Sequence, residues 1–123
     1  MRVFSEDTWG ILRENVIGSA PEWVYENGRL VRRNELHGNI ALGPGKLEHI
    51  YARTGRMALF AAGNGDVDLE MLQEARFRLV IVHDDAEREY VVTAAAEKLL
   101  ESSRQGGWTM VSMKDDWKTI FKE

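Results

Sequence analysis

The 123-residue sequence contains no cysteine, which excludes disulfide bonds, thiol catalysis and cysteine-ligated zinc or iron–sulfur sites. It has no apolar run near the roughly 20 residues that span a bilayer, and no signal-peptide pattern at its start. We therefore expect no membrane partner, and the lack of both a signal peptide and disulfide-forming cysteines favours the cytoplasm. Basic residues are not in excess, since 16 Lys and Arg stand against 20 Asp and Glu, so we expect no nucleic-acid partner.

The composition that remains is that of a folded protein. Hydrophobic residues make up 44% of the chain and charged residues 29%. The length suits one core, so we interpret residues 1–123 as a single domain. Helical and strand patterns alternate along the chain, which predicts an α/β domain with a partly parallel sheet.

Local signals predict the elements of that domain. Residues 1–10 are typical of a short helix closed by Gly10. Asn15–Ser19 is a short apolar run, which predicts a strand. Asn27 and Gly28 lie between two strand-like segments and predict a hairpin, because both turn residues need a positive φ. The other expected elements are helices over residues 46–54, 69–75, 93–104 and 115–121 and strands over 57–62, 77–82 and 108–113.

A polar turn follows the buried strand expected at 57–62. In open α/β sheets, ligands bind beyond the carboxyl ends of the strands, and this turn contains Asn64, Asp66 and Asp68. Their side-chain oxygens are hard ligands of the kind that Mg²⁺ selects. The alternative is structural, with Asp68 as a helix N-cap and Asn64 as an ordinary turn residue.

Two further features invite a functional interpretation. Lys46 follows Gly43-Pro44-Gly45 at the start of a helix, where it could help the helix N–H groups to bind a phosphate. A solvated surface lysine is the alternative. His83 and Asp84 follow the strand expected at 77–82 and are candidate substrate-side residues, although a hydrogen-bonded core histidine is the more common explanation of a residue such as His83.

Taken in order, these segments resemble a known family. Gly45-Lys46, a helix, and then the run Phe60–Leu72 resemble the third and fourth motifs of haloacid dehalogenase (HAD) superfamily hydrolases, closest to the phosphoserine phosphatase-like branch. The first residues look like the helix that follows the family's second motif. His83–Tyr90 and Ser112–Trp117 look like the tail of a bacterial subgroup. The resemblance covers nearly all of the chain.

The resemblance implies a Mg²⁺-dependent phosphomonoester hydrolase that acts on a phosphorylated small molecule. In such an enzyme, Lys46 and Asp68 would be catalytic, and Asn64, Asp66 and Asp68 would supply metal ligands. The implied fold is a partial HAD-like Rossmannoid three-layer sheet with a β-hairpin insertion.

The sequence also departs from the family pattern. The nucleophilic aspartate-x-aspartate motif and the second-motif Ser or Thr would lie before Met1, and Asn64 stands where the family has a metal-binding aspartate. We therefore expect this chain alone to be an inactive C-terminal part of a HAD-like core.

The family's strand order, 5-4-1-2-3, adds a structural expectation. The strand at 57–62 would be strand 4, and without strands 1 and 2 its apolar edge would be bare. We expect that edge to be covered by a homodimer, by domain exchange or by a rearranged sheet. A different class of function stays open beside the phosphatase: a non-catalytic, HAD-derived module for protein interaction or assembly.

Overall fold

The computed structural model describes residues 1–88 and 95–119. Their contacts divide the chain into two compact units, each described here by itself. Unit 1 comprises Met1–Ala41 and Gly45–Arg56, and unit 2 comprises Leu42–Pro44 and Met57–Glu123.

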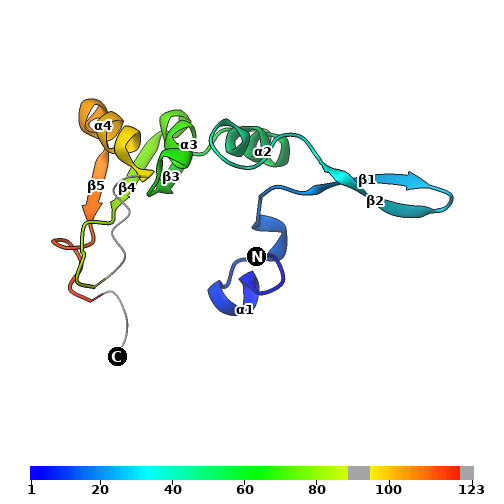
Figure 1. The fold of residues 1–123 in the computed structure, drawn as a ribbon, viewed down its shortest axis with the longest axis horizontal. Coiled ribbons are helices and arrows are strands. Elements are labelled where there is room, and N and C mark those ends of the chain that lie inside the picture. The colour runs from blue at the N-terminus through cyan, green and yellow to red at the C-terminus, as the bar shows by residue number, and fades with distance from the viewer. Residues whose placement is uncertain (89–94, 120–123) are drawn as a thin grey trace. The chain divides into compact units, whose positions relative to one another are not determined.

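The helices and strands follow one another as labelled in Figure 1. Unit 1 contains helix α1 (Ser5–Trp9), the short 3₁₀ helix η1 (Arg13–Asn15), strands β1 (Pro21–Glu26) and β2 (Arg29–Leu36), and helix α2 (Pro44–Thr54), whose first residue belongs to unit 2. Unit 2 contains β3 (Phe60–Gly63), η2 (Asp66–Asp68), α3 (Leu69–Glu74), β4 (Phe77–Val82), α4 (Glu97–Gly106) and β5 (Thr109–Ser112).

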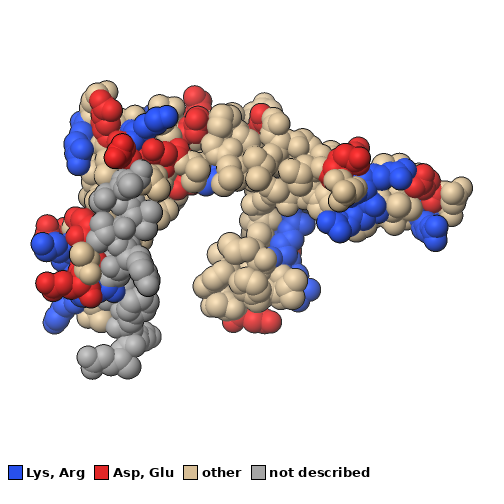
Figure 2. Space-filling model, in the orientation of Figure 1, with Lys and Arg blue, Asp and Glu red and all other residues tan. Residues whose placement is uncertain are grey.

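The predicted hairpin of unit 1 is confirmed. Strands β1 and β2 pair antiparallel, and the turn between them holds Asn27 at φ 51° and Gly28 at φ 76°. Both residues therefore adopt the left-handed conformation that this two-residue turn requires. Basic and acidic side chains both lie along the hairpin in Figure 2, and Arg33 forms an ion pair with Glu26 at 3.0 Å.

The strand predicted at Asn15–Ser19 is wrong. Asn15 ends the 3₁₀ helix, and residues 16–20 form no strand. A strand is defined by its neighbour, and among the described residues no other segment pairs with this one. The short helix predicted at the start is confirmed, with Gly10 at φ 66° closing α1.

Unit 2 is built on a parallel three-stranded sheet in the order β3-β4-β5. The α/β prediction with a partly parallel sheet is therefore confirmed. The buried residues of the core cluster come from β3, α3, the residue that follows α3, β4 and α4: Ala61, Leu72, Ala75, Val80 and Leu99. Trp108 and Met110 pack against this core from the last strand and the residue before it.

Several predicted boundaries change. The first strand of the sheet begins at Phe60 rather than Met57, and α4 spans Glu97–Gly106 rather than 93–104. Thr93, its expected N-cap, lies outside the described residues. The helical turn expected at 115–121 is wrong over 115–119, which form turns and bends without a helix, and 120–121 lie outside the described residues. No described helix has the length and apolar character to cross a bilayer.

Candidate functional site

The turn after β3 is closed by Asp68. Its Oδ2 accepts hydrogen bonds from the backbone N–H groups of Asn64 at 3.1 Å and Gly65 at 3.3 Å. The carboxylate lies so close to Gly63 that a Cβ there would sit 2.5 Å from the Cβ of Asp68. Asp68 is buried, at 7% exposure. A buried acid thus shapes the backbone where β3 ends.

The hydrogen bonds of Asp68 show whether its side chain caps a helix, which is the structural alternative to a role as a metal ligand. The residue occupies the N-cap position of α3, but its side chain makes no capping bond to that helix. It turns back to Asn64 and Gly65 instead, and Asn64 itself is exposed. Asp68 therefore stabilises the turn, while the Asn64 side chain is open to solvent.

Asp66 caps a helix that lies far along the chain. Its Oδ1 accepts the backbone N–H of Leu99 at 2.9 Å, in the first turn of α4. An acceptor at this position satisfies one of the orphan N–H groups of a helix N-terminus. The sequence contains no local signal for this bond, because the two residues are 33 positions apart.

Asp84 lies at the carboxyl end of β4, where it anchors the end of β5. Its carboxylate accepts the Ser112 hydroxyl at 3.0 and 2.8 Å and the backbone N–H of Lys114 at 3.1 Å. Burial raises the pKa of Asp84, but these hydrogen bonds lower the pKa further, so the net value lies below that of an ordinary aspartate. His83, the other predicted substrate-side residue, precedes it and is half-buried.

Asp85 and Arg88 form a pair that the sequence interpretation did not single out. The Arg88 guanidinium donates to Asp85 Oδ2, and the backbone N–H groups of Glu87 and Arg88 donate to Oδ1 at 3.1 and 3.0 Å. Burial raises the pKa of Asp85, but the hydrogen bonds and the charge of Arg88 lower it below the ordinary value. An Asp that begins a turn and accepts the N–H groups two and three residues on is the local sequence signal that could have identified Asp85.

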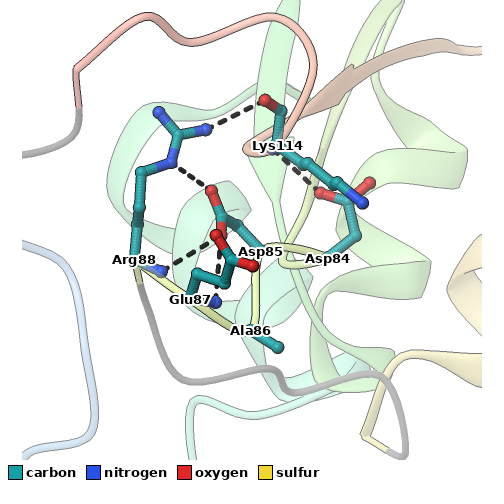
Figure 3. A pocket seen from close by; sticks show the side chains of 6 residues that line it. All are labelled: Asp84, Asp85, Ala86, Glu87, Arg88 and Lys114. Atoms are coloured by element: carbon teal, nitrogen blue, oxygen red, sulfur yellow. Dashed lines mark hydrogen bonds and ion pairs between the residues drawn. The ribbon is translucent and has the colours of Figure 1, made fainter.

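Arg88 also holds the segment after β5. Its guanidinium donates to the carbonyl groups of Met113 and Trp117 at 2.8 Å, of Lys114 at 2.9 Å and of Lys118 at 3.3 Å. Figure 3 shows its side chain reaching from the end of β4 to this segment. Arg88 thus joins the segment 113–118 to the turn that follows β4.

These residues surround a small pocket of about 350 Å³. It is lined by Asp84, Asp85, Ala86, Glu87, Arg88 and Lys114 (Figure 3). Acidic and basic side chains are mixed around it, and Arg88, Asp84 and Asp85 are already bonded to protein groups. The pocket therefore suits a small polar ligand better than an apolar one.

The predicted site residues fall into three places. Asn64, Asp66 and Asp68 share the turn after β3, and His83 and Asp84 follow β4 in the same sheet. Lys46 lies in the first turn of α2 and belongs to unit 1. The geometry of unit 2 therefore brings together only the predicted oxygen ligands.

The turn after β3 offers only a few oxygen ligands for Mg²⁺. Within residues 1–88 and 95–119, no group of three His, Cys, Asp or Glu side chains is arranged to hold a metal ion. Asp66 Oδ1 accepts the N–H of Leu99, and Asp68 Oδ2 accepts the N–H groups of Asn64 and Gly65. Mg²⁺ is often held by one or two carboxylates together with waters and substrate phosphate. The turn fits that mode, with Asp68 and Asn64 as the protein ligands.

One further carboxylate oxygen stands out near this turn. Glu70 Oε2 is buried and has no hydrogen-bond partner among the described residues. It lies in the first turn of α3, and a Cβ on Gly43 would meet it at 3.5 Å. A buried carboxylate oxygen without a donor is costly unless it is protonated or meets a cation.

No protein-family model matches the chain, and no curated protein matches it.

Proposed function

We propose that this chain is the C-terminal part of a HAD-like phosphohydrolase core, which binds a phosphorylated small molecule together with Mg²⁺. The observation that carries the proposal is the turn after β3. A parallel strand ends at Gly63, and a buried Asp68 then folds the chain so that the Asn64 side chain is open to solvent. Ligands of parallel α/β sheets bind at this end of the strands.

The strand pairing supports the same proposal. In the HAD order, strand 5 lies beside strand 4, and here β4 lies parallel beside β3. A three-layer Rossmannoid sheet of that kind needs further strands on the free side of β3. The small parallel sheet is compatible with this arrangement and supplies one end of it.

Each predicted residue has a role in the proposal. Asp68 and Asn64 would hold Mg²⁺, with Asp66 beside them in the same turn, and Mg²⁺ would neutralise phosphate charge. Lys46, in the first turn of an 11-residue helix, would by itself help the N–H groups of that helix to bind a phosphate. His83 and Asp84 would face the substrate, beside the pocket after β4.

We expect binding without turnover. The sequence contains one Asp-x-Asp segment, Asp66-Val67-Asp68, and both of its carboxylates accept backbone N–H bonds. Neither is arranged as a free nucleophile. Hydrolysis of p-nitrophenyl phosphate at an enzyme-like rate that Asp68→Ala abolishes would contradict this expectation.

Thermal unfolding tests the binding. A ligand that binds only the folded state stabilises it by about 2.7 kcal/mol at a hundred times its Kd. We expect Mg²⁺ with inorganic phosphate to raise the melting temperature, and Lys46→Met and Asp68→Asn each to reduce the rise. Lys98→Met is the matched control for the first variant, since Lys98 lies in the first turn of α4. Asp115→Asn, on an exposed turn, is the control for the second.

Two results would overturn the proposal. One is a melting temperature that Mg²⁺ and phosphate leave unchanged in the parent chain. The other is a rise that both site variants retain. Equal loss in a site variant and its control would also remove the assignment of that residue.

A second candidate is a non-catalytic assembly module that forms a homodimer. The observation that favours it is the edge of β3, because only β4 pairs with that strand among the described residues. Leu59 and Phe60 on this edge are 64% and 56% exposed. This candidate predicts an oligomer whose melting temperature does not respond to Mg²⁺ and phosphate.

A further inference from the structure

An apolar groove lies in unit 1, beside the segment expected to be a strand. Its volume is about 550 Å³. Six of its lining residues are Met1, Val3, Val16, Ile17, Pro21 and Trp23. Arg2 is its one charged lining residue, and the Nε of that side chain donates to the Val16 carbonyl at 2.9 Å.

The lip of this groove carries free backbone groups. The backbone N–H and C=O groups of Ile17 and Gly18 make no hydrogen bond to any described residue. The chain enters this segment extended, with Val16 at φ −87° and ψ 109°. An extended segment with free backbone groups is what an exposed sheet edge of another chain can add as a further strand.

The edge of β3 in unit 2 has no pairing strand among the described residues. Residues 57–65 contain no charged side chain, whereas natural sheet edges are usually protected by charge, proline or a bulge. Phe60 stacks on Phe77 with ring centroids 5.7 Å apart, and both rings are about half exposed. This edge offers unpaired backbone groups together with apolar side chains.

Charge decides between two ways of covering that edge. Unit 1 has eight Lys and Arg against seven Asp and Glu, whereas unit 2 has eight against thirteen. Pairing β3 with β3 of another copy would bring two acidic units together. Placing β3 in the groove of a near-neutral unit avoids that repulsion.

We infer that the apolar groove of unit 1 binds the β3 edge of a second copy of this chain, with Ile17–Ser19 as the strand that pairs with it. The contact uses unit 1 of one copy and unit 2 of the other, so each chain carries both halves. This inference deepens the assembly candidate and is independent of the proposed phosphate binding.

The test is sedimentation of the full chain and of two variants that each destroy one half. Ile17→Lys places a charge in the groove, and Ala62→Lys places one on the exposed side of β3. We expect each variant to weaken self-association at least about tenfold, equivalent to one or two net hydrogen bonds. An equimolar mixture of the two should recover a dimer, because one copy keeps its edge and the other keeps its groove. Tyr25→Lys, on an exposed hairpin position outside the groove, should associate as the parent chain does.

Other outcomes would overturn the inference. A monomeric parent chain would do so, and so would an Ile17→Lys variant that associates normally while Ala62→Lys does not, since that pattern means that β3 pairs with β3. If circular dichroism shows that Ile17→Lys is unfolded, Gly18→Pro, which removes one backbone donor, takes its place. Neither Lys substitution touches Lys46 or Asp68, so the Mg²⁺ and phosphate experiment reports separately on the proposed function.

Discussion

The two units of this chain are stabilised in different ways. Every fully buried apolar side chain among the described residues lies in unit 2, where the sheet and the helices share one core. In the described part of unit 1 the buried residues are Ser5 and Gly45. Unit 1 therefore depends on local structure, a hairpin turn and a helix, while unit 2 depends on tertiary packing. Unit 1 therefore leaves apolar side chains exposed, among them Trp23, Tyr25 and Leu30.

The largest expected effect tests this contrast directly. Leu72 is completely buried in the core of unit 2, so Leu72→Ala removes side-chain packing and leaves a cavity. We expect the free energy of unfolding to fall by about 2–5 kcal/mol. Leu30→Ala is the matched change on β2 of unit 1, where the side chain is 62% exposed, and it should cost less than about 0.5 kcal/mol. Urea unfolding of both variants measures the two values, and equal losses would contradict the contrast.

A smaller effect is expected at the turn after β3. Gly63→Ala would place a methyl group against Asp68, so the turn or the carboxylate must shift. We expect a loss of about 1–3 kcal/mol in unfolding free energy, as for other overpacked sites, and loss of any response to Mg²⁺ and phosphate. Gly18→Ala in unit 1 is the control, since a Cβ there meets nothing within 4 Å.

The Gly63→Ala and Gly18→Ala chains together show whether the turn after β3 tolerates a methyl group. Both variants are compared with the parent chain at low protein concentration, so that association does not contribute. A Gly63→Ala chain as stable as the Gly18→Ala chain would mean that the turn adapts easily. It would then be a poor platform for ligand binding.

The same contrast explains what could be predicted from the sequence. The hairpin is predicted correctly because Asn27-Gly28 demands a left-handed turn whatever surrounds it. The run 77–82 is predicted as a strand because a continuous apolar segment of that length suits a buried parallel strand. Both signals are contained within a few neighbouring residues.

The errors and omissions have a common physical cause. Residues 15–19 have the composition of a strand but no neighbour to pair with, and pairing cannot be read from the segment itself. The cap that Asp66 provides depends on a helix 33 residues away. The carbonyl groups that Arg88 binds lie 25 to 30 residues further on. Predicting such contacts requires the fold, so the sequence predicts the oxygen ligands of the site but not the network that surrounds them.

That network gives the smallest expected effect, a dependence on pH confined to the end of unit 2. The pKa of Asp85 is lowered in the folded chain, so its contribution to stability is complete above the unfolded pKa of about 3.9. The contribution is lost as the pH falls through the lower folded value, because protonation removes the charge that Arg88 pairs with. Asp85→Asn removes that charge at every pH. The difference in urea midpoint between the parent chain and Asp85→Asn should therefore be constant from pH 7 to about pH 5 and shrink toward pH 2.

Asp115→Asn provides the matched control for this titration, because Asp115 is exposed in the segment that Arg88 holds. Its midpoint should follow that of the parent chain at all pH values. Hydrogen exchange adds a local readout, since the backbone N–H groups of Glu87 and Arg88 donate to the Asp85 carboxylate. These amides should lose protection in Asp85→Asn, while those of β4 keep theirs because Val80 is held by the core. Loss of protection throughout β4 would mean that the Asp85–Arg88 pair supports the whole sheet. The distinction between a core held by apolar packing and a chain end held by polar contacts would then be wrong.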